Sequence, residues 1–275
     1  MLKDMVVNLS TTAADDTTRD YAITLAREFG SHLFAVAFAV EPIAPTLVVE
    51  GGPPELFAEW LREAEAAAEA AVKKFNDAAR GSGLLTNARW LTTTVGGSAD
   101  LFGRIARRFD LAIIRQSEPD DDSPNSLMIE TALFDSGRPV LVVPYVHKGA
   151  ARLERGLVCW DGSRNAARAV GDAMPFLQRA KSVEVAIVGD RIKSREIAGA
   201  DIAQHLARHG VKVEVKELIA PDMDAANIIL SHAADISADF MVMGGYGHSR
   251  LREFILGGVT RSVLGTMTIP TLMSH

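Results

Sequence analysis

Two halves of this 275-residue chain repeat one order of apolar and amphipathic segments, and such a repeat restricts the fold strongly. In each half an aspartate, Asp110 or Asp239, precedes a short apolar run. A segment with helical apolar spacing comes before each aspartate. A proline followed by another apolar run, at 139–143 and at 270–273, comes after it. The two halves are therefore expected to fold in the same way.

Each half alternates short apolar runs with amphipathic segments, in the order β-α-β-α-β-α-β-α-β. Continuous apolar strands between helices are typical of a parallel sheet that is covered on both faces. Right-handed crossovers turn this order into an open, doubly wound sheet. The sequence thus predicts the α/β class, with two tandem doubly wound domains. Each domain is expected to be a mainly parallel five-stranded sheet flanked by helices.

A short polar and small-residue stretch near 147–151 separates the halves, which predicts domains at 1–147 and 150–275. The first half has an additional Pro- and Gly-rich segment, 41–54. The alanine-rich run at 64–72 has strong helix propensity. We interpret it as a surface helix, with a partner-binding face as the alternative.

Composition excludes several classes of protein. The formal net charge of −6 offers no bulk attraction to nucleic acid. A single cysteine, Cys159, excludes an internal disulfide and fits a reducing compartment. The N-terminus lacks the pattern of a signal peptide, and no apolar stretch reaches the ~18 residues that a membrane helix needs. A cytoplasmic protein with neither nucleic acid nor membrane as partner is expected.

Glycines cluster after the fourth predicted strand of the second half. Gly244 and Gly247 are separated by two residues, and nine more lead to Gly257 and Gly258, just before a predicted helix at 259–264. Glycine permits close backbone approach, so successive N–H groups can form an anion nest. The N-terminus of the following helix also favours phosphate. The spacing fits a polyphosphate site and, equally well, tight turns at a strand–helix junction.

The pattern Gly244-x2-Gly247-x9-Gly257-Gly258 resembles the ATP-binding signature of the universal stress protein family. Segment 160–163, Trp-Asp-Gly-Ser, is similar to that family too. The resemblance covers the second half by motif and the first half by plan. It implies ATP, with or without Mg²⁺, as the bound cofactor. The implied contacts are Cys159, Trp160 and Val188 around adenine, Asp161 on ribose or base, and Met243, Gly244, Gly247, Gly257, Gly258 and Val259 on ribose and phosphates.

The expected strand ends agree with this placement, because ligands of open α/β sheets bind at the carboxyl ends of strands. The family's strand order would put Asp161 and Met243 side by side. The sequence departs from the family's pattern at two positions of the proposed ATP site. Gly258 replaces the family's Ser or Thr, at a cost of ~1.5–3 kcal/mol in affinity for one hydrogen bond to a charged group. Trp160 is bulky, so it either stacks on the base or narrows the slot.

The first half lacks the motif. Counted from the shared aspartates, Arg115 stands where the second half has Gly244, and Ser10 stands near the place of Asp161. No glycine occurs between 104 and 136, and the acidic residues Glu118 and 120–122 would repel a triphosphate. We expect the first half to bind no ATP and to pack as a pseudo-symmetric partner. The acidic run is interpreted as a solvated loop, with a cation-binding loop as the alternative.

Three further features contain side chains of types that serve in metal sites, phosphate sites or catalysis. His205 and His209 have metal-ligand spacing on a predicted helix but lack a third ligand, so a solvated face is favoured. His248 in the glycine loop either touches phosphate or faces solvent. Cys159 is interpreted as a buried apolar residue rather than a nucleophile.

These features predict a stress-related regulatory protein that binds ATP in its C-terminal domain and is no dedicated enzyme. A nucleotide-free interaction module of the same fold and a slow ATPase remain as alternatives. An ATP pyrophosphatase would need a Ser-Gly-Gly-x-Asp-Ser loop, which segment 160–165 does not match. A homodimer is a further expectation, because an edge strand at 270–273 could pair with another copy across a two-fold axis. The alternative is that the two halves satisfy this pairing inside the chain.

Overall fold

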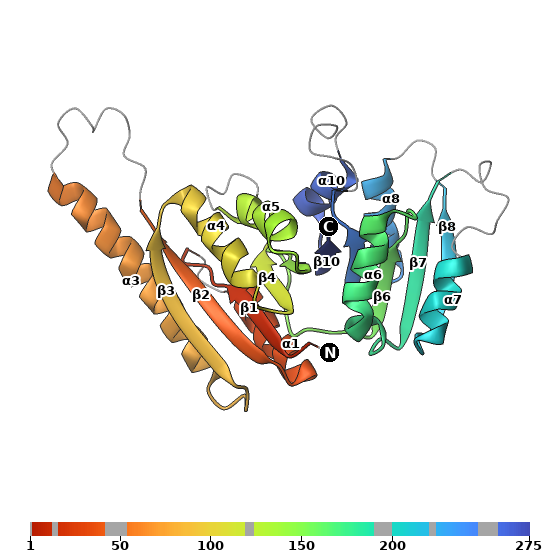
Figure 1. The fold of residues 1–275 in the computed structure, drawn as a ribbon, viewed down its shortest axis with the longest axis horizontal. Helices are drawn as coiled ribbons and strands as arrows, with labels where there is room; N and C mark the ends of the chain where they lie inside the picture. The colour runs from red at the N-terminus through yellow and green to blue at the C-terminus, as the bar shows by residue number, and fades with distance from the viewer. Residues whose placement is uncertain are drawn as a thin grey trace. The chain divides into compact units, whose positions relative to one another are not determined.

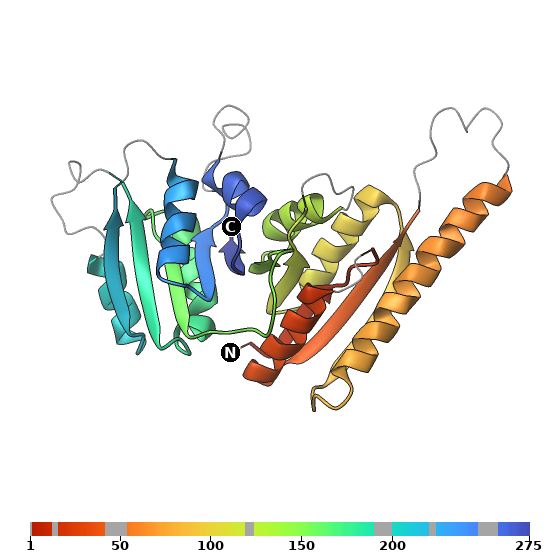
Figure 2. The same cartoon turned by 180° about the vertical axis from the view of Figure 1, so that it is seen from behind.

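The computed structural model describes residues 2–12, 16–41, 54–118, 124–189, 200–219, 224–246 and 258–275. These residues form two compact units. The N-terminal unit comprises Leu2–Arg138 with Lys148–Ala151, and the C-terminal unit comprises Pro139–His147 with Arg152–His275. Figure 1 and Figure 2 show their elements from opposite sides.

The N-terminal unit is a parallel sheet of four strands in the order β3-β2-β1-β4. Helices α1 and α3 lie on one face of the sheet, and α4 and α5 lie on the other (Figures 1 and 2). Its elements are β1 (Asp4–Asn8), α1 (Thr17–Phe29), β2 (His32–Val40), α3 (Pro54–Ala79), β3 (Thr86–Thr93), α4 (Val95–Ala106), β4 (Leu111–Arg115) and α5 (Asn125–Asp135).

The C-terminal unit is a sheet of six strands in the order β5-β10-β9-β6-β7-β8. All neighbours are parallel except β5, which runs antiparallel to β10. Its elements are β5 (Val140–Val143), β6 (Arg155–Cys159), α6 (Arg164–Leu177), β7 (Ser182–Val188), α7 (Ala200–Arg208), β8 (Val213–Leu218), α8 (Ala225–Asp235), β9 (Phe240–Gly244), α10 (Val259–Thr266) and β10 (Thr271–Ser274).

The predicted fold class is confirmed, since each half of the sequence contributes five strands to a doubly wound α/β arrangement. One strand is shared unexpectedly. β5 belongs by sequence to the first half, yet it packs in the C-terminal unit. Its four residues are all buried, so the pairing with β10 removes a wholly apolar strand from water. The division at 147 and 150 stays a prediction about independently folding domains.

The two halves repeat the same hydrogen bonds at equivalent aspartates. Asp110 Oδ2 accepts the backbone N–H groups of Lys3 and Asp4 at 2.7 and 3.1 Å. Asp239 Oδ2 accepts those of Glu154 and Arg155 at 3.1 and 2.8 Å. Both aspartates thus cap the start of the first strand of their own half. This shared task explains why an aspartate precedes the fourth strand twice.

Strand β10 is paired on both sides, with β9 and with β5. Of the two alternatives for segment 270–273, the structure therefore shows the one in which the pairing is satisfied inside the chain. An exposed edge strand offers unpaired N–H and C=O groups to another copy, and β10 no longer offers them.

A histidine joins the first three strands of the N-terminal unit. His32 Nδ1 lies 2.6 Å from Asp4 Oδ1, and His32 Nε2 lies 2.9 Å from Asn87 Oδ1. Burial of the ring disfavours its charged form. The hydrogen bonds to Asp4 and Asn87 and the charge of Asp4 outweigh that effect, and the pKa of His32 is raised above 6.5.

This contact predicts a pH-dependent stability. The stability that protonated His32 adds to the folded state is fully present below pH 6.5. It is lost as the pH rises through the raised pKa of His32. We expect His32→Ala to lower the free energy of unfolding by about 0.5–1 kcal/mol at pH 5.5 and by less at pH 9, because the pair is partly exposed. Urea unfolding at both pH values measures this, with Asp4→Asn as the matched change that abolishes the same pH dependence. An equal effect of His32→Ala at both pH values would contradict the assignment.

No helix among the described residues is long and apolar enough to cross a membrane.

Candidate functional site

The predicted site residues that belong to β6, β7 and β9 lie where these three neighbouring parallel strands end. β6 lies between β7 and β9, and their carboxyl ends are at Cys159, Val188 and Gly244. The chain leaves β6 through Trp160, whose N–H donates to Ala186 O at 2.9 Å. The expectation that the ends of the first and fourth strands lie side by side is therefore confirmed.

The turn after β6 is built by its own side chains. Asp161 Oδ1 accepts the N–H of Ser163 at 2.9 Å, and Gly162 between them has φ +75°. Ser163 then caps α6 by accepting the N–H of Ala166 at 3.1 Å. Glycine is favoured at this left-handed position because a Cβ would be strained there. One oxygen of the exposed Asp161 carboxylate is thereby used, and the side chain remains at the surface.

Gly244 ends β9 in close contact with the first turn of α6. A Cβ on this residue would lie 2.6 Å from Ala166 N and 2.8 Å from Asn165 C. Both are main-chain atoms of a helix, so they cannot turn aside as a flexible side chain would. The sequence predicted this glycine as a ligand contact. The structure gives it a second task, which is to let the strand end approach the helix.

Asn165 holds the segment that follows Gly244. Its side chain is buried, and Nδ2 donates to the carbonyl oxygens of Gly245 and Tyr246 at 2.8 and 3.2 Å. The same Nδ2 lies 2.9 Å from Nδ1 of His275. One amide thus fixes two successive carbonyls. Neither Asn165 nor His275 was found from the sequence, since no local pattern relates them to residues 80 and 30 positions away.

The two described ends of the glycine loop are joined by a hydrogen bond. Tyr246 has φ +48° and its N–H donates to Thr260 Oγ1 at 3.1 Å, across a loop of which 247–257 lie outside the described residues. The N–H of Gly245 donates to Ser274 O at 2.8 Å. These two amides are therefore used inside the protein. An anion would have to be held by main-chain groups from Gly247 onward and by the start of α10.

Helix α10 begins without a side-chain cap. Gly258 is its N-cap residue, and no described side chain accepts a hydrogen bond from the first turn. The hydroxyl of Thr260, in the first turn of α10, already accepts the hydrogen bond from Tyr246 N. A cap of Ser, Thr, Asp or Asn would satisfy one of the first-turn N–H groups, so its absence leaves those groups for water or an anion.

The thiol of Cys159 is unsuited to nucleophilic chemistry. Burial, together with the nearby charge of Asp161, raises the pKa of Cys159 to about 12. The thiolate is the reactive form, and it is scarcely populated at neutral pH with such a pKa. The prediction that Cys159 serves as a small apolar residue agrees with this environment.

The other predicted residues differ in what they can offer. The side chain of Met243 is buried, so this residue can offer a ligand only its main chain. Val259 is exposed on the first turn of α10. Trp160 and Val188 are half-buried. Gly247, His248 and Gly257 lie outside the described residues, as do the acidic residues 120–122. Their roles stay predictions.

The sheet register confirms which residues correspond between the halves. Met5 pairs with Leu111 as Gly156 pairs with Phe240, which places Arg115 at the position of Gly244. Arg115 is largely buried and forms an ion pair with Glu118. A side chain of this size at the end of β4 replaces the close strand–helix approach that Gly244 permits.

The protein is thus of the doubly wound α/β class, and its candidate site lies at the carboxyl ends of β6, β7 and β9, where such folds bind ligands. Residues 153–275, the C-terminal half of the chain, match the model of the universal stress protein family.

Three proteins illustrate the likeness. A universal stress protein of Archaeoglobus fulgidus DSM 4304 has a similar structure, with a TM-score of 0.74 at 14% identity, covering 98% of this chain and 96% of that one. A protein of Pseudomonas aeruginosa UCBPP-PA14, described as a putative universal stress protein, gives a TM-score of 0.59 at 15% identity, with coverage of 99% and 93%. At these identities the likeness concerns the fold alone. A universal stress protein of Synechocystis sp. is 36% identical over 67 residues, which are 24% of this chain and 22% of that protein.

Proposed function

We propose that the C-terminal unit binds ATP at the carboxyl ends of β6, β7 and β9, and that the protein is a cytoplasmic regulator rather than a dedicated enzyme. The observation that carries this proposal is the bond between Tyr246 N and Thr260 Oγ1. It brings together the two glycine-bearing flanks of the loop, so main-chain N–H groups on both sides can face one anion. The uncapped start of α10 adds the positive end of a helix dipole.

The remaining contacts follow from the strand ends. Asp161 has a second carboxylate oxygen for a ribose hydroxyl, because Ser163 occupies only Oδ1. The half-buried Trp160, directly after β6, and Val188, at the end of β7, would flank adenine. Met243 offers its main chain. Among the described residues no group of three His, Cys, Asp or Glu side chains could hold a metal, so Mg²⁺ would arrive with the nucleotide.

The binding test uses the whole chain. We expect calorimetric titration with ATP to give one saturable site per chain, and Gly247→Val to weaken that site at least about 100-fold, because its side chain takes the space of a phosphate. Gly171→Ala is the control, since that glycine lies in α6 with open space around it. Unchanged ATP affinity in Gly247→Val would contradict the phosphate nest.

One site per chain is expected because the N-terminal unit has Arg115 in place of Gly244. The ion pair of Arg115 with Glu118 occupies the end of β4. We propose that this unit serves as the pseudo-symmetric companion of the nucleotide-binding half. A stoichiometry of two ATP molecules per chain would overturn this part of the proposal.

A nucleotide-free interaction module is the second candidate, and two observations favour it. Gly258 supplies no hydroxyl to phosphate, and the bulk of the half-buried Trp160 would narrow a slot for the base if the ring does not stack on it. Adenine absorbance in the protein as purified separates the candidates, because the module would carry none. Slow ATP hydrolysis is a third option, which release of inorganic phosphate from ATP would reveal.

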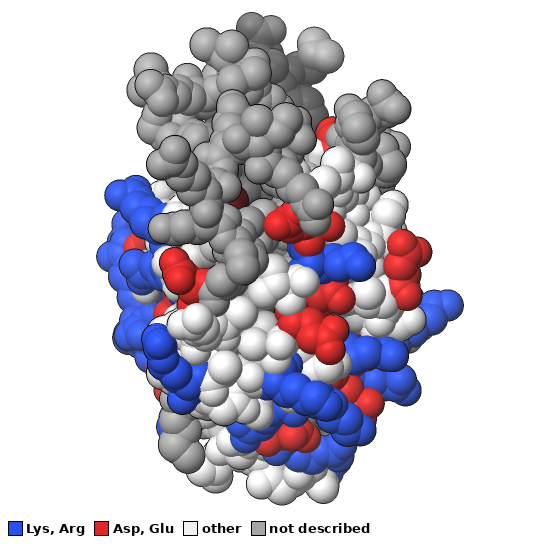
Figure 3. All heavy atoms as spheres, turned by 90° about the vertical axis from the view of Figure 1, so that its right-hand side faces the viewer, with Lys and Arg blue, Asp and Glu red and all other residues white. Residues whose placement is uncertain are grey.

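Nucleic acid is not proposed as a partner. Figure 3 shows acidic and basic side chains interleaved on the face at the β8 and α7 end of the C-terminal unit. A nucleic-acid surface needs a patch or stripe of one sign. The net charge of −6 acts in the same direction. A homodimer would have to use a surface other than β10, which already has two neighbours.

A further inference from the structure

The N-terminal unit contains a cavity that its proposed loss of ATP binding does not explain. The cavity has a volume of about 80 Å³ and lies beyond the carboxyl end of β1. The described residues that line it come from three segments, namely residues 10–11 after β1, the start of α1 and the middle of α3. It is lined by Ser10, Thr11, Asp16, Arg19, Ala67, Ala70, Ala71 and Lys74.

Helix α3 gives the cavity its room. Ala67, Ala70, Ala71 and Lys74 follow one another at the spacing of a single helical face. Three methyl groups form the wall, and one long cationic side chain stands at its end. The alanine-rich run that the sequence presented as a plain surface helix thus borders a polar space. Larger side chains on this face would fill it.

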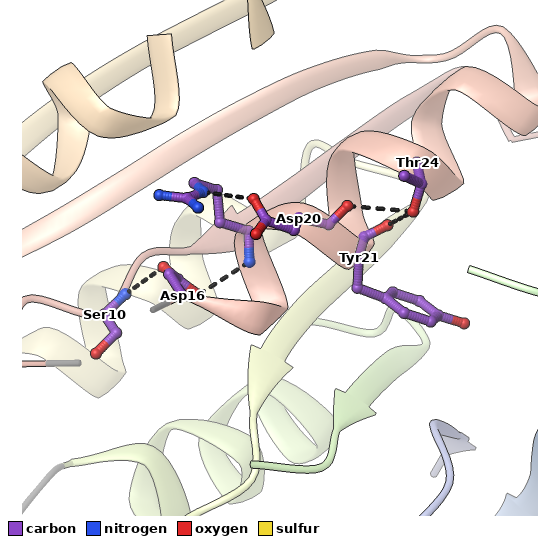
Figure 4. A network of polar contacts seen from close by, with 6 residues as sticks. Ser10, Asp16, Asp20, Tyr21 and Thr24 are labelled. Carbon is purple, nitrogen blue, oxygen red and sulfur yellow. Dashed lines mark hydrogen bonds and ion pairs between the residues drawn. The ribbon is translucent and has the colours of Figure 1, made fainter. Parts of the chain in front are cut away.

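The start of α1 closes the opposite side through a fixed carboxylate. Asp16 is buried, and its two oxygens accept the N–H groups of Ser10 and Arg19 at 3.0 and 2.9 Å. Figure 4 shows Asp16 between Ser10 and the first turn of the helix. The carboxylate therefore holds the backbone in place. Burial raises the pKa of Asp16, although the two backbone hydrogen bonds and the charges of Arg19 and Arg115 oppose that effect.

Two cations and one carboxylate line the cavity. Arg19 Nε donates to Asp20 Oδ1 at 2.7 Å, which compensates part of the charge of Arg19. The ammonium of Lys74 makes no hydrogen bond or ion pair with another described residue. Among the described residues, its charge therefore has no compensating partner. With the hydroxyls of Ser10 and Thr11 beside it, the space offers hydrogen-bond donors to a negatively charged group.

The volume limits the size of such a group. Pockets for whole nucleotides and similar ligands measure roughly 300–1,000 Å³, while about 10–15 Å³ of probe space holds one water. A cavity of about 80 Å³ therefore admits an ion of a few heavy atoms. We propose that this cavity is a binding site for a small oxyanion of the phosphate type, contacted by Lys74, Arg19 and the hydroxyls of Ser10 and Thr11. The site is independent of the proposed ATP site, because it belongs to the other compact unit.

The test is a calorimetric titration of the whole chain with inorganic phosphate in a phosphate-free buffer. Lys74→Gln removes the uncompensated charge, and Ala70→Leu fills the space. We expect each to weaken phosphate binding at least about fivefold, the scale of one charged hydrogen bond at a partly exposed site. Lys73→Gln and Ala66→Leu are the matched controls. Both are exposed residues of α3 outside the cavity, and they should bind as the wild type does.

Gly247→Val separates this proposal from the ATP site. It should leave phosphate binding in the N-terminal unit unchanged, whatever it does to ATP. Absence of saturable phosphate binding in the wild type would overturn the site. Equal weakening by Lys74→Gln and Lys73→Gln would overturn it as well, and so would loss of phosphate binding in Gly247→Val. Circular dichroism of each variant shows that the fold is kept.

Discussion

Replacing Gly244 by alanine is expected to lower the free energy of unfolding by about 2–3 kcal/mol, the cost of overpacking a rigid contact. The new Cβ would lie 2.6 Å from Ala166 N and 2.8 Å from Asn165 C, so either β9 or the first turn of α6 must move. The same shift displaces the strand end at which ATP is proposed to bind, and ATP affinity should fall with stability. Thermal unfolding should show a loss of about 5–10 °C.

The control for this change is Gly171→Ala. Gly171 lies in α6, where an added Cβ meets no atom within 4 Å. Alanine is a better helix former than glycine, so this variant should melt at or above the wild-type temperature. If Gly244→Ala melted like Gly171→Ala, the close approach of β9 to α6 would be wrong.

Asn165→Asp is expected to cost about 2–4 kcal/mol at neutral pH, because it turns a donor between two carbonyls into a charged acceptor. Asn165 Nδ2 serves Gly245 O and Tyr246 O, and both oxygens would lose this donor and face a carboxylate, with only His275 Nδ1 remaining near Gly245 O at 3.2 Å. Unsatisfied buried polar groups cost roughly 1–3 kcal/mol each. The segment leading into the glycine loop would also lose its anchor, so ATP affinity should drop in parallel.

The pH dependence of this variant provides an internal check. Burial beside two carbonyl oxygens raises the pKa of the new carboxyl group above its unfolded value, so its protonated form fits better. The loss of stability should therefore shrink as the pH falls. Asn76→Asp, the same change at an exposed position of α3, should have little effect at any pH. A pH-independent loss for Asn165→Asp would show that the amide does not bridge the two carbonyls.

Much of the architecture could be predicted because it depends on local patterns. Apolar runs between amphipathic segments identified most of the described strands, and the aspartates Asp110 and Asp239 marked the repeat. Their matching bonds to the starts of β1 and β6 show that the repeated letter reflects a repeated contact. The correspondence of Arg115 with Gly244, counted along the sequence, agrees with the sheet register.

The candidate site was predictable only in outline. Glycine spacing indicated where the loop is, and the parallel order indicated that Asp161 and Gly244 follow adjacent strands. The amides of Gly245 and Tyr246 lie within the predicted anion nest, yet they bond to Ser274 O and Thr260 Oγ1. A local pattern cannot tell which acceptor an N–H meets, because that acceptor comes from a distant part of the chain.

The amino-acid sequence alone therefore determined the twofold α/β plan, the position of the glycine loop and the loss of that loop from the first half. Periodicity and residue type carry this information within a few turns or strands. Tertiary structure decided that β5 joins the C-terminal unit and that Asn165 clamps two carbonyls. It also decided that an alanine face of α3 borders a polar cavity. Each of these depends on contacts between segments that are distant in the sequence. The free energy of burial and hydrogen bonding at these positions arises only when those segments are in contact.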